Sequence, residues 1–143
     1  MLEFSDDEVV PIKELVELYD SVGWMLYVAD PDALARAVDR STYVVTARDD
    51  GELVGLARVM SDDVSIMYLQ DILVRPSHHR QGIGTVLATR CLERFEHVRQ
   101  KVLLTDDEPG QAAFYSSLGY RNLDDLSPTG LNAFVQFDGL TDL

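Results

Sequence analysis

One turn of the chain gathers basic, glycine and hydroxyl residues at the start of a predicted helix: Arg80, Gln81, Gly82, Ile83, Gly84 and Thr85. Main-chain N–H groups at a helix start lack acceptors and lie at the positive end of the helix dipole. Gly82 and Gly84 have no Cβ, so a bulky anion can approach the backbone there. The turn therefore predicts a pyrophosphate site, although glycine pairs also occur in turns that only begin a helix.

The turn differs from two common phosphate-binding motifs. The loop of nucleoside triphosphatases needs Gly, four residues and then Gly-Lys-Ser/Thr, and this turn has neither that spacing nor a lysine. The dinucleotide fingerprint needs a third glycine at position 87, where this chain has Leu87. A different kind of phosphate turn is therefore expected.

Asp71 is the candidate general base. Strand alternation turns Asp71, Leu69 and Leu73 to one face, away from Gln70 and Ile72. A carboxylate among apolar strand residues needs either a partner or a function. Asp71 either accepts a proton from a substrate, directly or through water, or is bonded to neighbouring backbone at an irregularity of the strand.

Three other residues have reactive side chains. His78 and His79 precede the turn and are of a type that acts as a base, but adjacent histidines on a loop are more often solvent-exposed. Cys91 is the only cysteine and falls on the apolar stripe of a predicted helix, which favours buried packing over a nucleophile. The histidine pair alone predicts no metal site.

Hydrophobic periodicity predicts mixed α and β elements around these residues. Apolar residues at helical spacing behind Pro11, and the cap Asp30 before Pro31, predict two early helices. Turn signals separate three β-rich segments that should form an antiparallel meander. The expected helices cover 12–19, 31–40, 82–98 and 111–118, and the expected strands cover 42–48, 52–60, 64–74, 101–105 and 131–137.

Length and composition predict one globular domain over residues 1–143. The chain is 46% hydrophobic and 26% charged, with a formal net charge of -13. This charge repels nucleic acid phosphates, so nucleic acid is not expected as a partner; it favours cationic partners such as amines, or only hydrates the surface. No apolar run suits a membrane span and no signal peptide is visible, which predicts a cytoplasmic protein that binds no membrane.

Two segments resemble the signatures of the Gcn5-related N-acetyltransferase (GNAT) family. Leu73-Val74-Arg75-Pro76 followed by His79-Arg80-Gln81-Gly82-Ile83-Gly84 is similar to the family's motif A, Gln/Arg-x-x-Gly-x-Gly/Ala. Ala113-Phe114-Tyr115-Ser116-Ser117-Leu118-Gly119-Tyr120 is similar to its Phe-Tyr-x-x-x-Gly-Phe/Tyr segment. His79 departs from motif A, which usually has Gln or Arg there; because the turn binds through backbone amides, the change should tune the site without abolishing it.

The resemblance implies a mixed α+β GNAT fold. Its central sheet is mostly antiparallel and twisted, with six to seven strands, splayed strands four and five, and about four flanking helices. It also implies an enzyme that uses acetyl-CoA and no metal. The pantetheine arm would lie along the backbones of Leu73 and Val74, residues 80–85 would hold the pyrophosphate, and Phe114 would pack nearby or belong only to the core.

Roles in acetyl transfer follow from the same resemblance. Tyr115 matches the family tyrosine beside the cofactor sulfur, where a phenol can protonate the leaving thiolate; a buried structural tyrosine is the alternative. A backbone N–H near Leu73 would polarise the acetyl carbonyl. Trp24 and Tyr27 fall in the connection that usually roofs the acceptor pocket, where they would hold an aromatic or cationic amine or simply fill the core.

Three functions fit the resemblance. The first is acetylation of a primary amine of a small molecule, and the segment 70–74 is similar to one in plant-type arylalkylamine (serotonin) acetyltransferases. The second takes a protein N-terminus or lysine as acceptor, which needs an open groove. The third is a non-catalytic acyl-CoA-binding module. Homodimers are common among family members, but nothing in the sequence identifies an interface.

Overall fold

The computed structural model describes residues 1–126 and 130–138 of the 143-residue chain. These residues form two compact units, Met1–Thr105 and Asp106–Leu143, and each unit is described by itself. The first unit contains the predicted phosphate turn and Asp71, whereas the second contains Phe114 and Tyr115. A single domain over residues 1–143 stays a prediction.

The first unit is built on one five-stranded sheet whose strands lie in chain order. The strands are β1 Leu2–Ser5, β2 Tyr43–Asp49, β3 Glu52–Ser61, β4 Ile66–Val74 and β5 Gln100–Leu103. Neighbours from β1 to β4 pair antiparallel, which confirms the predicted meander, and β5 pairs parallel with β4. The hairpin from β2 to β3 turns at Asp50 and Gly51, both at positive φ, as a tight two-residue hairpin requires.

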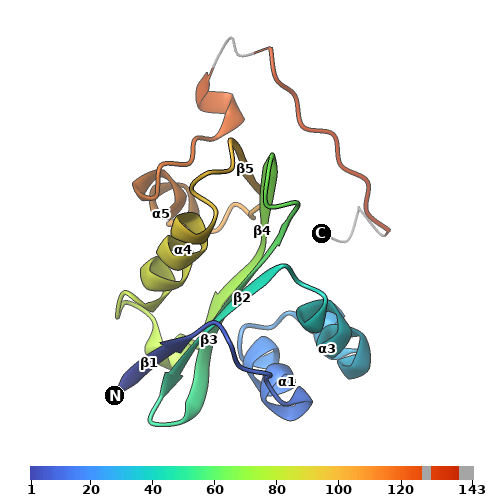
Figure 1. The fold of residues 1–143 in the computed structure, drawn as a ribbon, viewed down its shortest axis with the longest axis vertical. Helices are drawn as coiled ribbons and strands as arrows, with labels where there is room; N and C mark the ends of the chain where they lie inside the picture. The colour runs from blue at the N-terminus through green and yellow to red at the C-terminus, as the bar shows by residue number, and fades with distance from the viewer. Residues whose placement is uncertain (127–129, 139–143) are drawn as a thin grey trace. The chain divides into compact units, whose positions relative to one another are not determined.

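Helices cover both faces of this sheet (Figure 1). They are α1 Ile12–Ser21, α2 Met25–Val28, α3 Pro31–Asp39 and α4 Ile83–Arg94, with a 3₁₀ turn η1 at Pro76–His78. Helices α1 and α3 lie on one side of the sheet and α4 lies on the other (Figure 1). The Asp30 carboxylate accepts a hydrogen bond from the Ala33 N–H at 3.1 Å, so the predicted cap of α3 is confirmed.

Helix α4 is held against the sheet by a close approach at Gly55. A Cβ at Gly55 would lie 3.1 Å from Leu87 Cδ1, 3.3 Å from Ile83 Cγ2 and 3.3 Å from the Leu73 carbonyl oxygen. Ile83 and Leu87 belong to the first turns of α4, and Leu73 belongs to β4. Only a glycine therefore lets the start of α4 and the end of β4 sit this near to β3.

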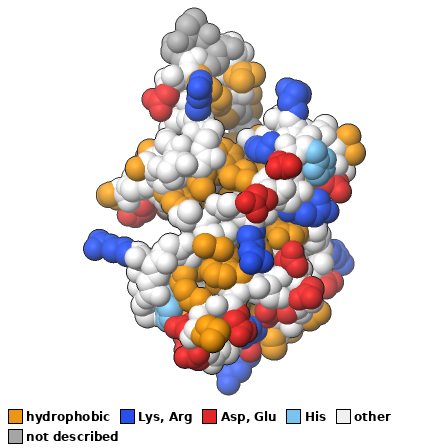
Figure 2. Space-filling model, turned by 60° about the vertical axis from the view of Figure 1, so that its left-hand side comes forward, with side chains coloured by type: hydrophobic (Ala, Val, Ile, Leu, Met, Phe, Trp, Pro, Cys, Tyr) orange, Lys and Arg blue, Asp and Glu red, His pale blue; other side chains and the backbone are white. Residues whose placement is uncertain are grey.

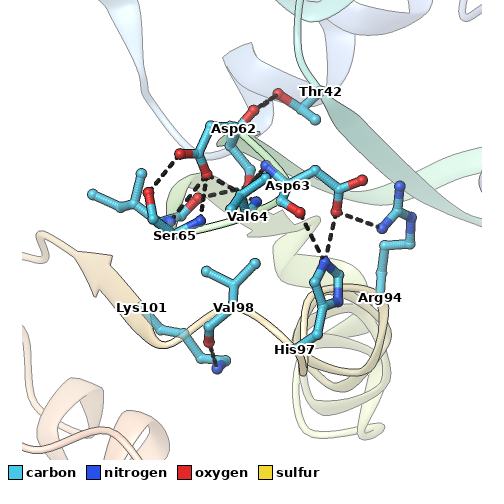
Figure 3. Close-up of polar contacts among 11 residues, drawn as sticks. Thr42, Asp62, Asp63, Val64, Ser65, Arg94, His97, Val98 and Lys101 are labelled. Atoms are coloured by element: carbon cyan, nitrogen blue, oxygen red, sulfur yellow. Dashed lines mark hydrogen bonds and ion pairs between the residues drawn. The ribbon is translucent and has the colours of Figure 1, made fainter.

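The other end of α4 is tied to the turn between β3 and β4 (Figure 3). The Asp63 carboxylate accepts from Arg94 Nη1 at 3.1 Å and contacts His97 Nε2 at 2.9 Å. Asp62 caps the same turn, because its Oδ1 accepts from the amides of Val64 and Ser65 at 3.0 and 2.8 Å. Both ends of α4 are thus fixed relative to β4.

Strand β4 pairs with β5 only over the first part of its length. The parallel pairing runs from Ile66 opposite Gln100 to Leu69 opposite Leu103. Beyond Leu69, β4 continues to Val74 beside β3 alone. Within the first unit, the edge of β4 from 70 to 74 therefore faces no strand on that side, as the splayed strands of the family require.

The strand count predicted from the sequence is wrong. Residues 1–126 and 130–138 contain five strands instead of six to seven, and five α-helices instead of about four. The predicted strand at 131–137 adopts no regular secondary structure: the described part of the second unit contains α5 Gln111–Ser117 and η2 Leu123–Leu126 but no second strand with which it could form a ladder. Conversely, Leu2–Ser5 pairs as β1, and α2 is a four-residue helix that was not predicted.

On the face drawn in Figure 2, acidic and basic side chains are interspersed with hydrophobic ones. Acidic groups occur in several places on that face and do not form one continuous area. None of the helices in 1–126 and 130–138 is long and apolar enough to cross a membrane.

We predict that Gly55→Ala lowers the free energy of unfolding by about 1–3 kcal/mol, because the new methyl group meets Leu87 and Ile83. Urea unfolding measures this loss. Leu87→Ala is the matched control: it removes the nearest contact, so the double variant should lose less than the sum of the single losses. Simple additivity of the two losses would contradict the close approach.

Candidate active site

The predicted phosphate turn presents main-chain N–H groups without acceptors. Helix α4 begins at Ile83 after Gly82, which has a φ of 78°, and Arg80 also has a positive φ of 64°. The first hydrogen bond of the helix runs from the Val86 N–H to the Gly82 carbonyl at 3.1 Å. Across the described residues, no acceptor bonds to the amides of residues 80–85.

This turn is also sterically open. Gly82 is exposed, and a Cβ built there would meet nothing within 4 Å. The side chains of Arg80, Gln81 and Thr85 are exposed as well, whereas Ile83 is buried against the sheet. An exposed row of unbonded amides at a helix start, with a guanidinium beside it, suits a diphosphate.

The backbone of β4 offers a second row of polar groups next to this turn. Arg75 N–H donates to the Val54 carbonyl at 2.8 Å, so these two residues form a hydrogen-bonded pair of the antiparallel ladder. The next pair, Gly55 and Val74, is then a non-bonded pair, and the peptide groups of Val74 point away from β3. By the same alternation, the peptide groups of Ile72 also point away from β3, toward the edge of β4 that does not pair with β5.

Leu73 has the opposite orientation. It pairs with Leu56, and its carbonyl oxygen lies near Gly55 on the β3 side. The register therefore favours Ile72 and Val74, instead of Leu73 and Val74, as the residues whose backbone faces the open edge. Sequence analysis missed Ile72, because the choice depends on which pairs of the ladder are hydrogen-bonded. A cofactor contact by Leu73 stays a prediction.

Asp71 is buried, as strand alternation predicted, and its carboxylate has three side-chain donors. It is 4% exposed. Its Oδ2 accepts from Arg58 Nε at 2.5 Å and from the Tyr19 hydroxyl at 3.0 Å. Its Oδ1 accepts from the Tyr27 hydroxyl at 2.8 Å. Both carboxylate oxygens are thus engaged by side chains of β3, α1 and α2.

Arg58 is the partner that neutralises Asp71. The two residues are cross-strand neighbours next to a register shift between Arg58 and Val59, so the expected strand irregularity is present at this point. Arg58 also donates to the Tyr27 hydroxyl at 3.2 Å and to Ser41 Oγ at 3.3 Å. Burial lowers the pKa of Arg58, but the Asp71 carboxylate outweighs it, so the net pKa is raised and the guanidinium stays charged.

Three aromatic rings cover this ion pair. Tyr19 packs against Tyr27 with centroids 5.0 Å apart and against Trp24 at 5.8 Å. Burial, and then the charge of Asp71, raise the pKa of both tyrosines, so their hydroxyls remain donors. Trp24 and Tyr27 are half-buried. The structure therefore brings together Trp24, Tyr27 and Asp71, and it adds Tyr19 and Arg58, which sequence analysis missed.

The two histidines before the turn have different partners. His78 Nε2 lies 2.9 Å from Asp49 Oδ2, and its Nδ1 lies 2.8 Å from Ser77 Oγ. The His78 side chain is only 16% exposed, so the expectation of an exposed residue is wrong for His78. His79 is exposed, and its Nε2 lies 2.8 Å from the Val74 carbonyl oxygen.

The remaining predicted site residues, Phe114 and Tyr115, lie on α5 in the second unit. Both are half-buried, and their rings pack edge to face with centroids 5.0 Å apart. Tyr115 also contacts the ring of Tyr120 at 6.2 Å. Their approach to the residues of the first unit stays a prediction.

Comparison with known proteins gives the family. The family model of the acetyltransferase (GNAT) domain matches residues 6–134, which cover most of both units. The chain belongs to the GNAT acetyltransferase family. It is therefore an acyltransferase, and GNAT enzymes use acetyl-CoA as co-substrate. Among the residues that the structure describes, no group of three or more His, Cys, Asp or Glu could hold a metal ion.

Relatives and solved structures agree with this GNAT assignment. An uncharacterized N-acetyltransferase, ycf52, of Pyropia yezoensis is 25% identical over 118 residues, which are 81% of this chain and 68% of the relative. A GNAT-family acetyltransferase of Streptococcus pneumoniae TIGR4 has a TM-score of 0.81 and 28% identity, with 97% and 99% of the two chains covered. An aminoglycoside acetyltransferase from a soil metagenome shares the fold, with a TM-score of 0.68 and 20% identity over 96% and 97% of the chains.

We predict that Asp71→Asn lowers the free energy of unfolding by about 3–5 kcal/mol, because the buried Arg58 charge loses its partner. Urea unfolding followed by Trp24 fluorescence measures the change. The paired variant Arg58→Met with Asp71→Leu should recover most of the loss, because neither charge then remains buried alone. A paired variant as unstable as Asp71→Asn would contradict this account.

Proposed function

We propose that this GNAT protein transfers an acetyl group from acetyl-CoA to a primary amine of a small molecule. The observation that carries the proposal is the row of unbonded amides at 80–85 next to the outward-facing backbone of β4. A diphosphate fits the row of amides, and an amide-containing arm that follows the diphosphate fits the backbone of β4. When bound, acetyl-CoA supplies an activated acetyl thioester.

The residues present fit coenzyme A in three respects. The amides of 80–85 and the Arg80 side chain match the diphosphate, and the absence of a Cβ at Gly82 leaves room for it. The peptide groups of Ile72 and the N–H of Val74 can bond an extended arm as a neighbouring strand would, whereas the Val74 carbonyl oxygen already lies 2.8 Å from His79 Nε2. An N–H of this edge is the proposed donor to the acetyl carbonyl oxygen.

The acceptor side is proposed to be formed by the half-buried rings of Trp24 and Tyr27, which pack against the fully buried Tyr19. Half-buried aromatic faces attract a cationic or aromatic amine, and the acidic surface of the protein favours the arrival of cations. Arg58 and Asp71 carry opposite charges, so their ion pair has no net charge. The proposed amine would therefore be bound by the ring faces and not by the ion pair.

Asp71 is proposed to position the acceptor cluster. A base needs a lone pair directed at the substrate, whereas three of the roughly four acceptor sites of the buried Asp71 carboxylate already accept from protein side chains. Asp71 holds the Tyr27 hydroxyl, which also accepts from Gln70 Nε2 at 3.3 Å. Removal of the amine proton by Asp71, directly or through water, remains the competing role.

Tyr115 is the proposed proton donor to the departing sulfur, on the strength of its match to the family tyrosine. Two other functions remain candidates. A protein N-terminus or lysine as acceptor is supported by the same cofactor features. A non-catalytic acyl-CoA-binding module predicts cofactor binding without turnover. Cytoplasmic location and dimerisation also stay predictions.

We predict that the parent protein binds coenzyme A in calorimetry and that Gly82→Val weakens this binding at least about tenfold. A side chain there is strained at a φ of 78° and fills the space that the diphosphate needs. Gly51→Val is the matched control, because Gly51 also has a positive φ, of 90°, and equally open surroundings in the β2–β3 hairpin. No binding by the parent protein would overturn the proposed function.

We predict that an amine panel releases free thiol from acetyl-CoA in the presence of the protein. Tyr115→Phe should lower kcat by roughly 100-fold or more with an unchanged Kd for coenzyme A, because the proposed proton donor is lost while the ring is kept. Tyr43→Phe is the control, since it removes a hydroxyl bonded to Asp6, away from the proposed site. Modification of peptides but of no free amine would favour a protein acceptor, and binding without any turnover would favour the non-catalytic module.

A further inference from the structure

His79 makes a contact that the proposed function does not yet use. Its Nε2 lies 2.8 Å from the carbonyl oxygen of Val74, five residues earlier in the chain. Because that carbonyl can only accept, the imidazole donates an N–H to it. Val74 is the last residue of β4, and its peptide groups point away from β3. The bond thus joins the residue before the phosphate turn to the end of the strand.

This bond closes a compact loop between β4 and α4. Inside the loop, the His78 N–H donates to the Arg75 carbonyl at 2.9 Å and the His79 N–H donates to the Pro76 carbonyl at 3.3 Å. Immediately after it comes Arg80, a non-glycine residue at a φ of 64°. Such a conformation persists only where the surroundings fix it. In the described residues, the backbone amides that follow have no bonds of their own to hold them.

We propose that His79 is a positioning residue that anchors the phosphate turn to β4. Its imidazole fixes the start of the turn, so that the amides of 80–85 are already arranged when a diphosphate arrives. This inference rests on the proposed function, since it deepens the role of the same turn. It also explains the departure from motif A: histidine, glutamine and arginine all carry a side-chain N–H that can reach back to a carbonyl.

The neighbouring His78 does not share this role. Its ring contacts Asp49 and Ser77, and no bond joins it to β4. Loss of the His79 side chain should therefore loosen the turn without disturbing the packing of the sheet, because His79 is exposed and absent from the buried core.

The test compares His79→Leu, which has no donor, with His79→Gln, which keeps one. Calorimetry with coenzyme A and with ADP, which carries the diphosphate but no arm, should give Kd values about three- to tenfold higher for His79→Leu, as the loss of one hydrogen bond implies. The Kd values of His79→Gln should stay near those of the parent protein. In both variants, kcat at saturating acetyl-CoA should not change. His97→Leu is the control for loss of an exposed imidazole.

A second readout needs no cofactor. Trypsin should cut after Arg80 faster in His79→Leu than in His79→Gln or the parent protein, as followed by mass spectrometry. The comparison requires that the three proteins have the same melting temperature, so that global unfolding does not account for the difference. Equal cleavage in all three proteins, or His79→Gln as weak a binder as His79→Leu, would overturn the anchoring role. Failure of the parent protein to bind coenzyme A would instead overturn the proposed function, while the cleavage rates still report on the anchor.

Discussion

Beyond Leu69, strand β4 pairs with another strand on one side only, and both halves of the candidate site depend on this. On the side of β3 the pairing continues to Val74, so the strand remains fixed. On the side of β5 the pairing stops at Leu69, so polar groups are left to a ligand. The same strand carries Asp71, whose side chain holds the aromatic cluster. One element therefore carries both the proposed cofactor edge and the residue that holds the proposed acceptor cluster.

The two faces of the sheet stabilise the site in different ways. On one face, the Arg58–Asp71 ion pair links β3 and β4 to the hydroxyls of α1 and α2, so polar bonds fix the helices there. On the other face, the missing side chain of Gly55 lets α4 pack at van der Waals distance. The first arrangement depends on the pairing of two buried charges, and the second depends on the absence of a side chain at Gly55.

Much of this organisation could be predicted from the sequence. Periodicity and turn residues located the meander, α3, α4 and the phosphate turn, because these depend on local chemistry. Arg58 as the partner of Asp71 could not be found in this way, because the partner follows from a register that shifts at Val59. Helix α2 has four residues, too few to show a period. The segment 131–137 is rich in apolar residues, as a strand is, yet composition alone does not place a second strand beside it.

The neutrality of the Arg58–Asp71 pair has a consequence for selectivity. Because the two charges cancel within the protein, the ion pair next to the aromatic rings exerts little net electric field on the proposed amine acceptor. Attraction of cations then comes from acidic groups on the outer surface, whose influence fades over a Debye length of about 8–10 Å in physiological buffer. For the proposed amine acceptor, ionic strength should thus change the rate at which the amine reaches the rings, whereas the shape of the amine should decide which amine binds.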